Sequence, residues 1–406
     1  MEDDRLFGTY VRMHRIRQNI KLEVMADQVK LNKGKLSKLE TGSMPWSDED
    51  KKNVLSYLKV QFHEGFHRKS LQNKVLEIYE MYAKLDRKKL KHNIKNIIDN
   101  TQLKDSKCFV DYCLVQYMCQ LLVCKDISHI ASLKHKIQKL VPYFSKIERL
   151  IYYDMQGLEL YYKQQYEEAV EYFEKVAKAR HESLSMMGYA HLNLVYSKLG
   201  NYQKAIHCIN KAITDAISTV SLKRLTYFIY HKANTYVHGL YIEEAKELYC
   251  QLLKETLYIE KELCRYIHQN LAYLYLFEKD FESCIIHTKK AFQQGLFDLD
   301  MYLYITYSYY MLQDNESFFI CLSKGVHKCA DSEFHLTFLE SLWFLYIEQN
   351  EYAITFMKDC VTMSNLYPLD ERIWILDVLK QCGGIVKDEE LVHQCTEQLL
   401  DLYRRN

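Results

Sequence analysis

A possible metalloenzyme motif lies near the end of the first seventy residues. The pattern H-E-x-x-H runs from His63 to His67, and in zinc proteases it places two histidines on one helical face beside a glutamate base. That chemistry requires a continuous helix and a third ligand. Gly65 lies inside the motif, and no downstream histidine or glutamate stands at a familiar spacing. We therefore expect no catalytic zinc site.

The thirteen cysteines do not form a metal or redox motif either. They are scattered from Cys108 to Cys395, and no two are spaced as C-x-x-C. Most have apolar neighbours, as Cys113 does, which is typical of small buried side chains in a reducing compartment. The sequence also lacks a glycine-rich phosphate loop and a G-x-S-x-G elbow. We expect a protein that is not an enzyme and that has no metal and no cofactor.

Polar side chains inside apolar stretches point to binding instead of catalysis. A side-chain amide carries both a donor and an acceptor, which is what a peptide backbone requires whatever its sequence. Each amide could equally make a structural hydrogen bond within its own repeat. Nearby basic residues could meet a peptide carboxylate or form surface salt bridges. The predicted peptide-binding residues are Asn193, Asn234, Asn270, Arg224, Lys232 and Arg265.

Recurring helix pairs are the elements that position these asparagines. Each copy has an aromatic-rich helix, a short turn and a second helix with an apolar stripe. The small residues of the second helices are spaced 36, 40 and 39 apart, and they are Ala169, Ala205, Ala245 and Cys284. The four copies are 152–176, 189–213, 230–253 and 267–292, with weaker copies near 302–325, 339–363 and 109–140.

These copies resemble the tetratricopeptide repeat, which has a small residue where its two helices cross. The resemblance implies a right-handed, TPR-like α-solenoid over 108–406 whose concave groove binds a peptide. The 34 tyrosines suit such a groove, although most can also be core positions of the repeat. A terminal apolar stripe could dimerise or cap the last repeat, and it consists of Leu391, Cys395, Leu399 and Leu402.

The composition agrees with an all-α protein. Only 12 glycines and 3 prolines occur in 406 residues, so turn-rich β architectures are disfavoured. No apolar run approaches the roughly 20 residues of a transmembrane helix. The N-terminus lacks a secretory signal, and we expect a cytoplasmic protein with no membrane partner.

The first sixty residues are basic and break into short helices. From Arg5 to Glu40 there are nine lysines and arginines against three acidic residues, although the whole chain has a net charge of only +1. A localised basic face is the expected footprint of phosphate contact. Asn32 and Ser47 are suitable N-caps, and Gly42 can supply a left-handed C-terminal cap.

This segment, FGTYVRMHRIRQNIKLEVMADQVKLNKGKLSKLETG, resembles the five-helix DNA-binding domain of the phage-repressor type (Cro/C1 or XRE). The matching features are Gly8, Arg15 with Glu40, Met25-Ala26, LSKLE and Gly42. The resemblance implies a structural ion pair between Arg15 and Glu40. It also implies that residues 32–41 form the helix that enters the major groove.

The predicted DNA-binding residues are Asn32, Lys33, Lys35, Ser37, Lys38, Arg12 and Arg17. Lysine can reach guanine or a phosphate, and serine can contact either. Two features depart from the family. Lys21 and Leu22 replace the usual polar opening of helix two, and Gly34 occupies a position that usually carries a polar contact. The alternative is a helical bundle whose basic face is merely solvated.

A phage-repressor-type domain (1–60), connecting helices (61–107) and a repeat array (108–406) together resemble the RRNPP group. This group (Rap, NprR, PlcR and PrgX) comprises peptide-responsive quorum-sensing regulators. The resemblance implies a homodimer on a palindromic operator in double-stranded DNA, controlled by a short signalling peptide. The alternative is a TPR scaffold that binds another regulatory protein and has a weak or vestigial DNA-binding domain.

Overall fold

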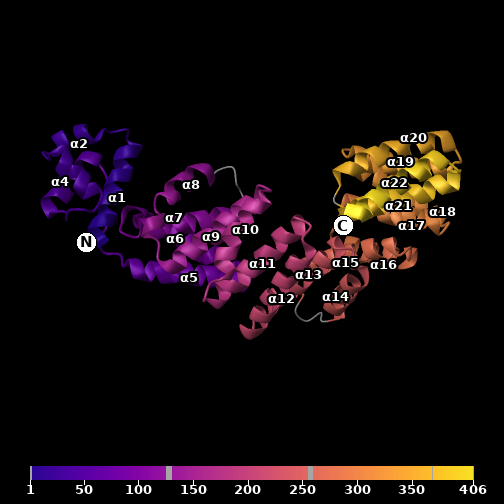
Figure 1. The fold of residues 1–406 in the computed structure, drawn as a ribbon, viewed down its shortest axis with the longest axis horizontal. Helices are drawn as coiled ribbons and strands as arrows, with labels where there is room; N and C mark the ends of the chain where they lie inside the picture. The colour runs from indigo at the N-terminus through magenta and orange to yellow at the C-terminus, as the bar shows by residue number, and fades with distance from the viewer. Residues whose placement is uncertain (1, 125–129, 255–258, 368, 406) are drawn as a thin grey trace. The chain divides into compact units, whose positions relative to one another are not determined.

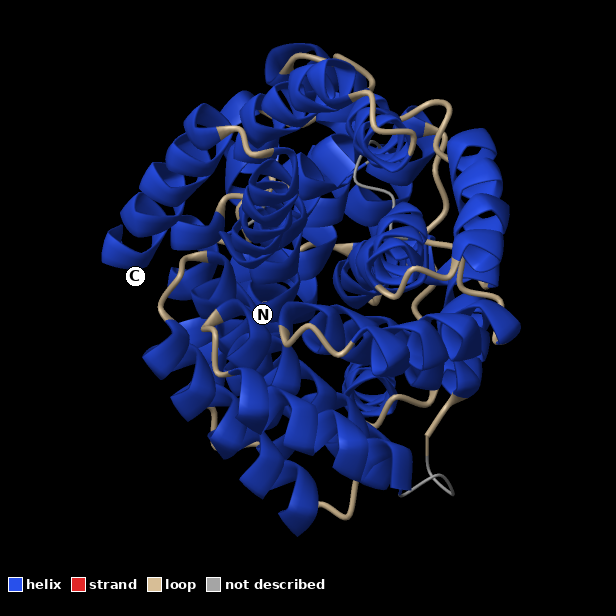
Figure 2. Cartoon of the chain, turned by 90° about the vertical axis from the view of Figure 1, so that its right-hand side faces the viewer, coloured by secondary structure: helices blue, strands red, loops and turns tan. Residues whose placement is uncertain are grey.

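The computed structural model describes residues 2–124, 130–254, 259–367 and 369–405. Every regular element in these ranges is a helix (Figure 2), and an isolated bridge between His63 and Ser106 accompanies them. The predicted all-α class is confirmed. The chain divides into two compact units, one of residues 1–199 with 214–224 and one of residues 200–213 with 225–406.

The N-terminal part of the first unit contains four helices before residue 60, one fewer than the five predicted. They are α1 (Glu2–Arg17), α2 (Leu22–Gln28), α3 (Lys33–Glu40) and α4 (Asp48–Leu58). Lys59 ends α4 in the left-handed region, and residues 60–67 are not helical. The helix that follows, α5 (Arg68–Ala83), packs mainly against later helices. The core of the domain includes Phe7, Val11, Met25, Leu36, Leu39 and Trp46.

Connecting helices follow within the same unit. The helix α5 packs against α6, α7, α9 and α11, because one of its faces carries buried apolar residues such as Val75 and Ile78. The predicted degenerate repeat at 109–140 contains α7, a π-helical turn and α8, and residues 125–129 lie outside the described residues. The elements are α5 (Arg68–Ala83), α6 (Arg87–Asp99), η1 (Thr101–Asp105), α7 (Phe109–Cys119), η2 (Gln120–Cys124), α8 (Ile130–Gln138) and η3 (Val141–Tyr143).

Helix pairs make up the rest of the chain (Figure 1). Successive helices pack on one another from α9 to α11 in the first unit and from α14 to α22 in the second. The helices are α9 (Lys146–Tyr162), α10 (Tyr166–Ala177), α11 (Glu182–Lys198), α12 (Tyr202–Ser218), α13 (Leu222–His238), α14 (Ile242–Lys254), α15 (Lys261–Phe277), α16 (Phe281–Gln293), α17 (Leu299–Met311), α18 (Asn315–Lys328), α19 (Glu333–Tyr346), α20 (Asn350–Met363), η5 (Ser364–Leu366), α21 (Leu369–Val386) and α22 (Glu389–Arg405).

The small residues of the repeats are all buried, as close helix crossings require. Ala169, Ala205, Ala245 and Cys284 are each fully inaccessible to solvent. The packing is equally tight at Gly188, where an added Cβ would overlap the backbone of Ala177 on the preceding helix. In the predicted TPR-like solenoid, neighbouring helices therefore pack so closely at these positions that only a small side chain fits between their backbones.

The C-terminal apolar stripe belongs to a last helix pair, α21 and α22. Leu391 and Cys395 are fully buried, and Leu399 and Leu402 are each 7% exposed. Leu391 packs over Gly383 of α21, where an added Cβ would meet its side chain at 3.2 Å. Of the two alternatives for this stripe, the structure supports the cap on the last repeat. Among the described residues, no helix is long and apolar enough to cross a bilayer.

Candidate DNA-binding and peptide-binding sites

A buried ion pair holds the helix-turn-helix together. Arg15 on α1 contacts Glu40 on α3 through two hydrogen bonds, Nε to Oε1 at 2.7 Å and Nη2 to Oε2 at 2.8 Å. Its third nitrogen donates to the carbonyl of Ile20. The hydrogen bonds to Glu40 raise the pKa of Arg15. At Gly8 a Cβ would overlap the carbonyl oxygen of Leu39, so α1 and α3 cross at close range.

The helix caps lie where the sequence predicts them. The Oδ1 of Asn32 accepts a hydrogen bond from the amide of Lys35 at 2.6 Å, and Ser47 accepts one from the amide of Asp50. Gly42 has a φ of 71°, the left-handed conformation that suits the residue after a helix. These caps fix both ends of α3, so the side chains between them have defined directions.

The predicted DNA-contact residues fall into two groups. One group is exposed and consists of Asn32 at the start of α3, Ser37 and Lys38 on α3, and Arg12 and Arg17 on α1. The two other lysines form ion pairs with neighbouring helices: the exposed Lys33 pairs with Glu23 of α2, and Nζ of the half-buried Lys35 lies 2.9 Å from an Asp50 carboxylate oxygen of α4. Lys38 and Ser37 therefore present an amine and a hydroxyl on the exposed face of α3.

The N-terminal four-helix domain is fastened to the connecting helices through α1. The hydroxyl of Tyr10 donates to the carbonyl of Gln61 at 2.8 Å and to Oδ1 of Asp105 at 3.0 Å, and its ring packs on Phe109. Burial, with the Asp105 carboxylate second, raises the pKa of Tyr10. This α1 anchor (Tyr10, Gln61 and Asp105) was not predicted, because nothing in the local sequence indicates its long-range partner.

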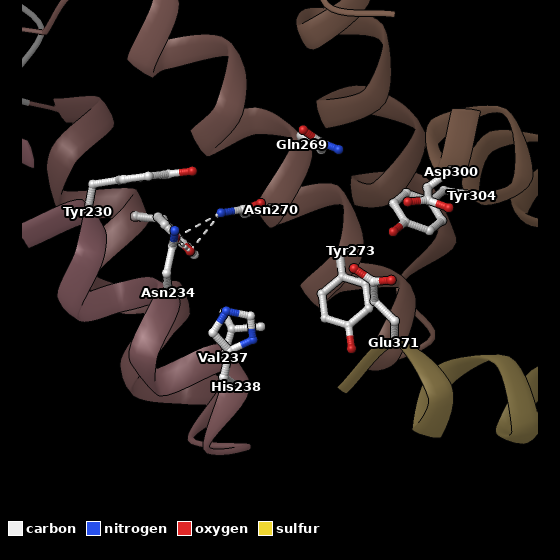
Figure 3. A pocket seen from close by; sticks show the side chains of 11 residues that line it. Tyr230, Asn234, Val237, His238, Gln269, Asn270, Tyr273, Asp300, Tyr304 and Glu371 are labelled. Atoms are coloured by element: carbon white, nitrogen blue, oxygen red, sulfur yellow. Dashed lines mark hydrogen bonds between the residues drawn. The ribbon is translucent and has the colours of Figure 1, made fainter. Parts of the chain in front are cut away.

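In the second unit, two of the predicted asparagines come together (Figure 3). The Nδ2 of Asn270, on α15, donates to Oδ1 of Asn234, on α13, at 3.1 Å and to the hydroxyl of Tyr249, on α14, at 2.8 Å. That hydroxyl in turn donates to Oδ1 of Asn234 at 2.5 Å. We call these three residues the amide cluster. Its hydrogen bonds fix the orientation of both asparagines.

The amide cluster lies at the edge of a cavity of about 140 Å³. Tyr230, Tyr273 and Tyr304 contribute aromatic walls, and Asp300 and Glu371 contribute carboxylates (Figure 3). His335 Nε2 lies 2.8 Å from Asp300 Oδ1 and so orients that carboxylate. The described lining has two carboxylates and no lysine or arginine, so the cavity is suited to a positively charged group.

The other predicted peptide-binding residues do not line this cavity. Asn193 lies on α11 in the first unit and is 1% exposed. Lys232 lies over the ring of Tyr236 at 5.5 Å. Arg265 pairs with Glu262 at 3.8 Å and lies over the ring of Tyr266 at 5.3 Å. The prediction that basic side chains would meet a peptide carboxylate finds no support at this cavity.

Arg224 corrects the prediction in the first unit. Its side chain is buried, and its guanidinium donates to the carbonyls of Ala83, at 2.7 Å, and Tyr82 at the end of α5. The last carbonyls of a helix have no partner within it, and a cation there also complements the helix dipole. Arg224 is therefore a structural cap and not a ligand for a peptide.

Sequence reasoning missed the residues that complete the cavity. Tyr249 is one of many tyrosines at core spacing, and its hydroxyl gives no separate signal. Asp300 follows an N-capping Asp298, and Glu371 lies in the first turn of α21, so both appear as ordinary acidic residues at helix starts. Only the packing of α13, α15, α17 and α21 brings them to one place.

The residue 60–67 segment also differs from a zinc site in its geometry. His63 donates its backbone amide to the carbonyl of Asp105 at 2.7 Å, and the segment is not helical. The two histidines of the motif therefore do not share a helical face. Within the described ranges, no group of three or more His, Cys, Asp or Glu side chains is placed to hold a metal ion.

Comparisons with known proteins concern the repeats and the chain as a whole. Residues 151–180 and 184–214 match the tetratricopeptide repeat family. The transcriptional activator NprA of Geobacillus stearothermophilus is 27% identical over 366 residues, which cover 83% of this chain and 88% of that protein.

Two solved structures share the fold. The apo form of the quorum sensor NprR from B. thuringiensis has a TM-score of 0.65 at 18% identity, covering 83% of this chain and 99% of that chain. NprR in complex with its cognate peptide NprX has a TM-score of 0.55 at 17% identity, covering 84% and 99%. The chain therefore shares its repeat fold with these two proteins, as the predicted resemblance to the RRNPP group implies.

Proposed function

We propose that this chain is a cytoplasmic transcriptional regulator, not an enzyme, whose operator binding is controlled by a short signalling peptide bound in the groove of the repeats. The observation that carries the proposal is the amide cluster beside an acidic, aromatic cavity, in a chain that also has a helix-turn-helix. The proposal is supported by NprA, named a transcriptional activator, and by NprR, solved with a cognate peptide. As a homodimer the protein would occupy a palindromic site.

On the DNA side, α3 would enter the major groove. Lys38 and Ser37 would contact base edges or phosphates from its exposed face. Arg12 and Arg17 would contact phosphates, which position the domain without reading sequence. Each phosphate contact releases counterions, so we expect affinity to fall steeply as salt rises.

On the peptide side, the amide cluster would bind main chain and the carboxylates would bind a cation. Asn234 and Asn270 are partly exposed, and their side chains are held in position by Tyr249. Asp300 and Glu371 suit the amino terminus of a peptide or a lysine or arginine side chain, because opposite charges strengthen a hydrogen bond. We therefore expect the active peptide to carry a positive group close to the segment held by the asparagines.

The test is selection of host genomic fragments by the purified full-length protein, with and without the small-peptide fraction of spent medium. An inverted-repeat fragment whose recovery changes with that fraction is the expected result. Recovery that ignores the peptide fraction would contradict peptide control. The absence of any enriched fragment under both conditions would contradict the DNA-binding function.

Single substitutions then separate the two sites. Lys38→Ala should weaken binding to the selected fragment, whereas Lys52→Ala, an exposed lysine on α4, should not. Asn270→Ala should abolish the response to peptide and leave peptide-free DNA binding intact. The matched control is Asn315→Ala, which makes the same chemical change at an exposed position outside the cavity.

A scaffold function is the second candidate. It is favoured by the ion pairs of Lys33 and Lys35, which link two of the three recognition-helix lysines to acidic residues of neighbouring helices, and by Gly34, which contributes no side chain. In that case the repeats would bind another regulatory protein. Failure of genomic selection, together with an intact fold by circular dichroism, is the outcome expected for a scaffold.

A further inference from the structure

A close pair of thiols lies at the end of α7. The Sγ atoms of Cys119 and Cys124 are 3.9 Å apart. All thirteen cysteines fall within the described residues; among them Cys124 is the exposed one and Cys119 is partly buried. Most of the others are buried, so Cys124 is the thiol that oxidants in solution reach most readily.

The proximity of the two thiols depends on an unusual backbone. Residues 120–124 form a π-helical turn directly after α7. In an α-helix each residue turns the chain by about 100°, so side chains five positions apart point roughly 140° away from each other. A π-helix bonds each carbonyl to the amide five residues ahead, which brings positions i and i+5 one above the other. The turn therefore aligns Cys119 with Cys124.

We propose that Cys119 and Cys124 form a reversible intrachain disulfide when the protein meets a peroxide. A disulfide requires the two Sγ atoms to approach to about 2 Å from Cα atoms roughly 4.4–6.8 Å apart, a separation that adjacent turns of a helix provide. Because Cys119 and Cys124 are only five residues apart, a disulfide between them would close a very short loop. The bond would therefore act locally, by fixing the π-helical turn, and would add little global stability.

The chemistry assigns separate roles to the two cysteines. The Cys124 thiolate attacks one oxygen of hydrogen peroxide, which breaks the O–O bond, forms a sulfenic acid and releases hydroxide. The Cys119 sulfur then attacks the Cys124 sulfur; the S–S bond forms, the S–O bond breaks, and water leaves with the Cys119 proton. Burial and the neighbouring Cys124 raise the pKa of Cys119 to about 11, so the exposed Cys124 is the thiol that reacts first with the peroxide. A dithiol reductant reverses the reaction by exchange.

The experiment oxidises the reduced full-length protein with equimolar hydrogen peroxide and blocks remaining thiols with N-ethylmaleimide. Chymotryptic digestion separates the two cysteines, because Leu121 and Leu122 lie between them. The expected product is a pair of fragments joined through Cys119 and Cys124, lighter by two hydrogens and released by dithiothreitol. Hydrogen exchange should slow at residues 120–124 in the oxidised protein.

Two variants and a control keep the outcome decisive. Cys119→Ser should stop at the Cys124 sulfenic acid, which dimedone labels, and Cys124→Ser should show neither product. Cys264→Ser, at another partly buried thiol, should still form the disulfide. Recovery of both cysteines as maleimide adducts, or a Cys124–Cys124 link between chains on a non-reducing gel, would overturn the proposal.

Discussion

Asparagine has two different structural roles in this chain. Asn270 and Asn234 bond to Tyr249 and remain partly exposed at a cavity, whereas Asn193 is buried. The sequence singles out these asparagines because a polar side chain in an apolar helix requires a hydrogen-bond partner. It does not predict which of them face a cavity, since the difference depends on contacts among α13, α14 and α15. The capping role of Arg224 was not predicted for the same reason, because the carbonyls that it contacts lie more than 140 residues away in the sequence.

At Glu40 we predict a large loss of domain stability on substitution. Glu40→Ala leaves the Arg15 guanidinium in a site where it is 12% exposed, and an uncompensated buried charge costs about 3–5 kcal/mol. Trp46 donates its indole N–H to the Leu39 carbonyl at 3.1 Å, so fluorotryptophan NMR at Trp46 during urea unfolding reports on this domain.

The control is Glu49→Ala, at an exposed position on α4, which should leave the unfolding midpoint unchanged within about 0.5 kcal/mol. The double variant Arg15→Met, Glu40→Leu should be less destabilised than Glu40→Ala, because it removes the orphaned charge. Equal destabilisation of both would show that packing, and not charge, dominates at this site.

At Arg224 we predict local opening of the end of α5. A hydrogen bond from a charged donor contributes about 1.5–3 kcal/mol, so Arg224→Ala should speed amide exchange roughly tenfold or more at residues 84–86. These amides close the last turn of α5 by bonding to Glu80, Tyr82 and Met81. Hydrogen-exchange mass spectrometry measures the change. Lys223→Ala, at the exposed neighbouring position, is the control, and an equal effect there would refute the capping role.

Among the elements, those that depend on local signals were predicted well. Asn32, Ser47 and Gly42 mark helix ends because capping is a property of a few adjacent residues. The repeats appeared because small residues recur where helices cross. Two elements were missed: the π-helical turn after α7, which has no distinctive sequence pattern, and the repeat formed by α21 and α22, where the sequence showed only an apolar stripe.

The α15–α16 pair should be sensitive to acid. His268 and His287 lie with their Nδ1 atoms 3.0 Å apart, and burial lowers the pKa of each to about 4. The unfolded chain, with a histidine pKa near 6.5, binds protons that the folded pair does not. The contribution of this pair to the free energy of unfolding is thus fully present above about pH 6.5, and it is lost as the pH falls towards 4.

Between pH 7 and pH 5 the free energy of unfolding should fall by at most about 2 kcal/mol per histidine, because the partial exposure of His287 reduces the effect. Urea unfolding followed by fluorotryptophan NMR at Trp374 measures it, because Trp374 is in the same unit. His287→Phe should reduce the pH dependence, and His327→Gln, an exposed histidine on α18, should not. A pH profile that His287→Phe leaves unchanged would refute this origin.

For the whole molecule, control by a peptide has a reciprocal consequence. If the peptide changes operator affinity by some factor, operator DNA must change peptide affinity by the same factor. For a coupling of about 1.4 kcal/mol, that factor is about tenfold. Fluorescence anisotropy of a labelled peptide, with and without operator duplex, tests the prediction. A scrambled duplex is the control, and unequal factors would mean that the two ligands do not share one equilibrium.

The α1 anchor has a consequence for how such proteins can be recombined. The Tyr10 hydroxyl donates to acceptors at Gln61 and Asp105, which lie beyond the last helix of the N-terminal four-helix domain. A chimaera cut at residue 60 would bury that hydroxyl against a foreign surface without its acceptors, at a cost of about 1–3 kcal/mol. A cut after Asp105 moves donor and acceptors together. A piece that is exchanged between related chains and keeps these hydrogen bonds therefore includes α5, α6 and η1 as well as the first four helices.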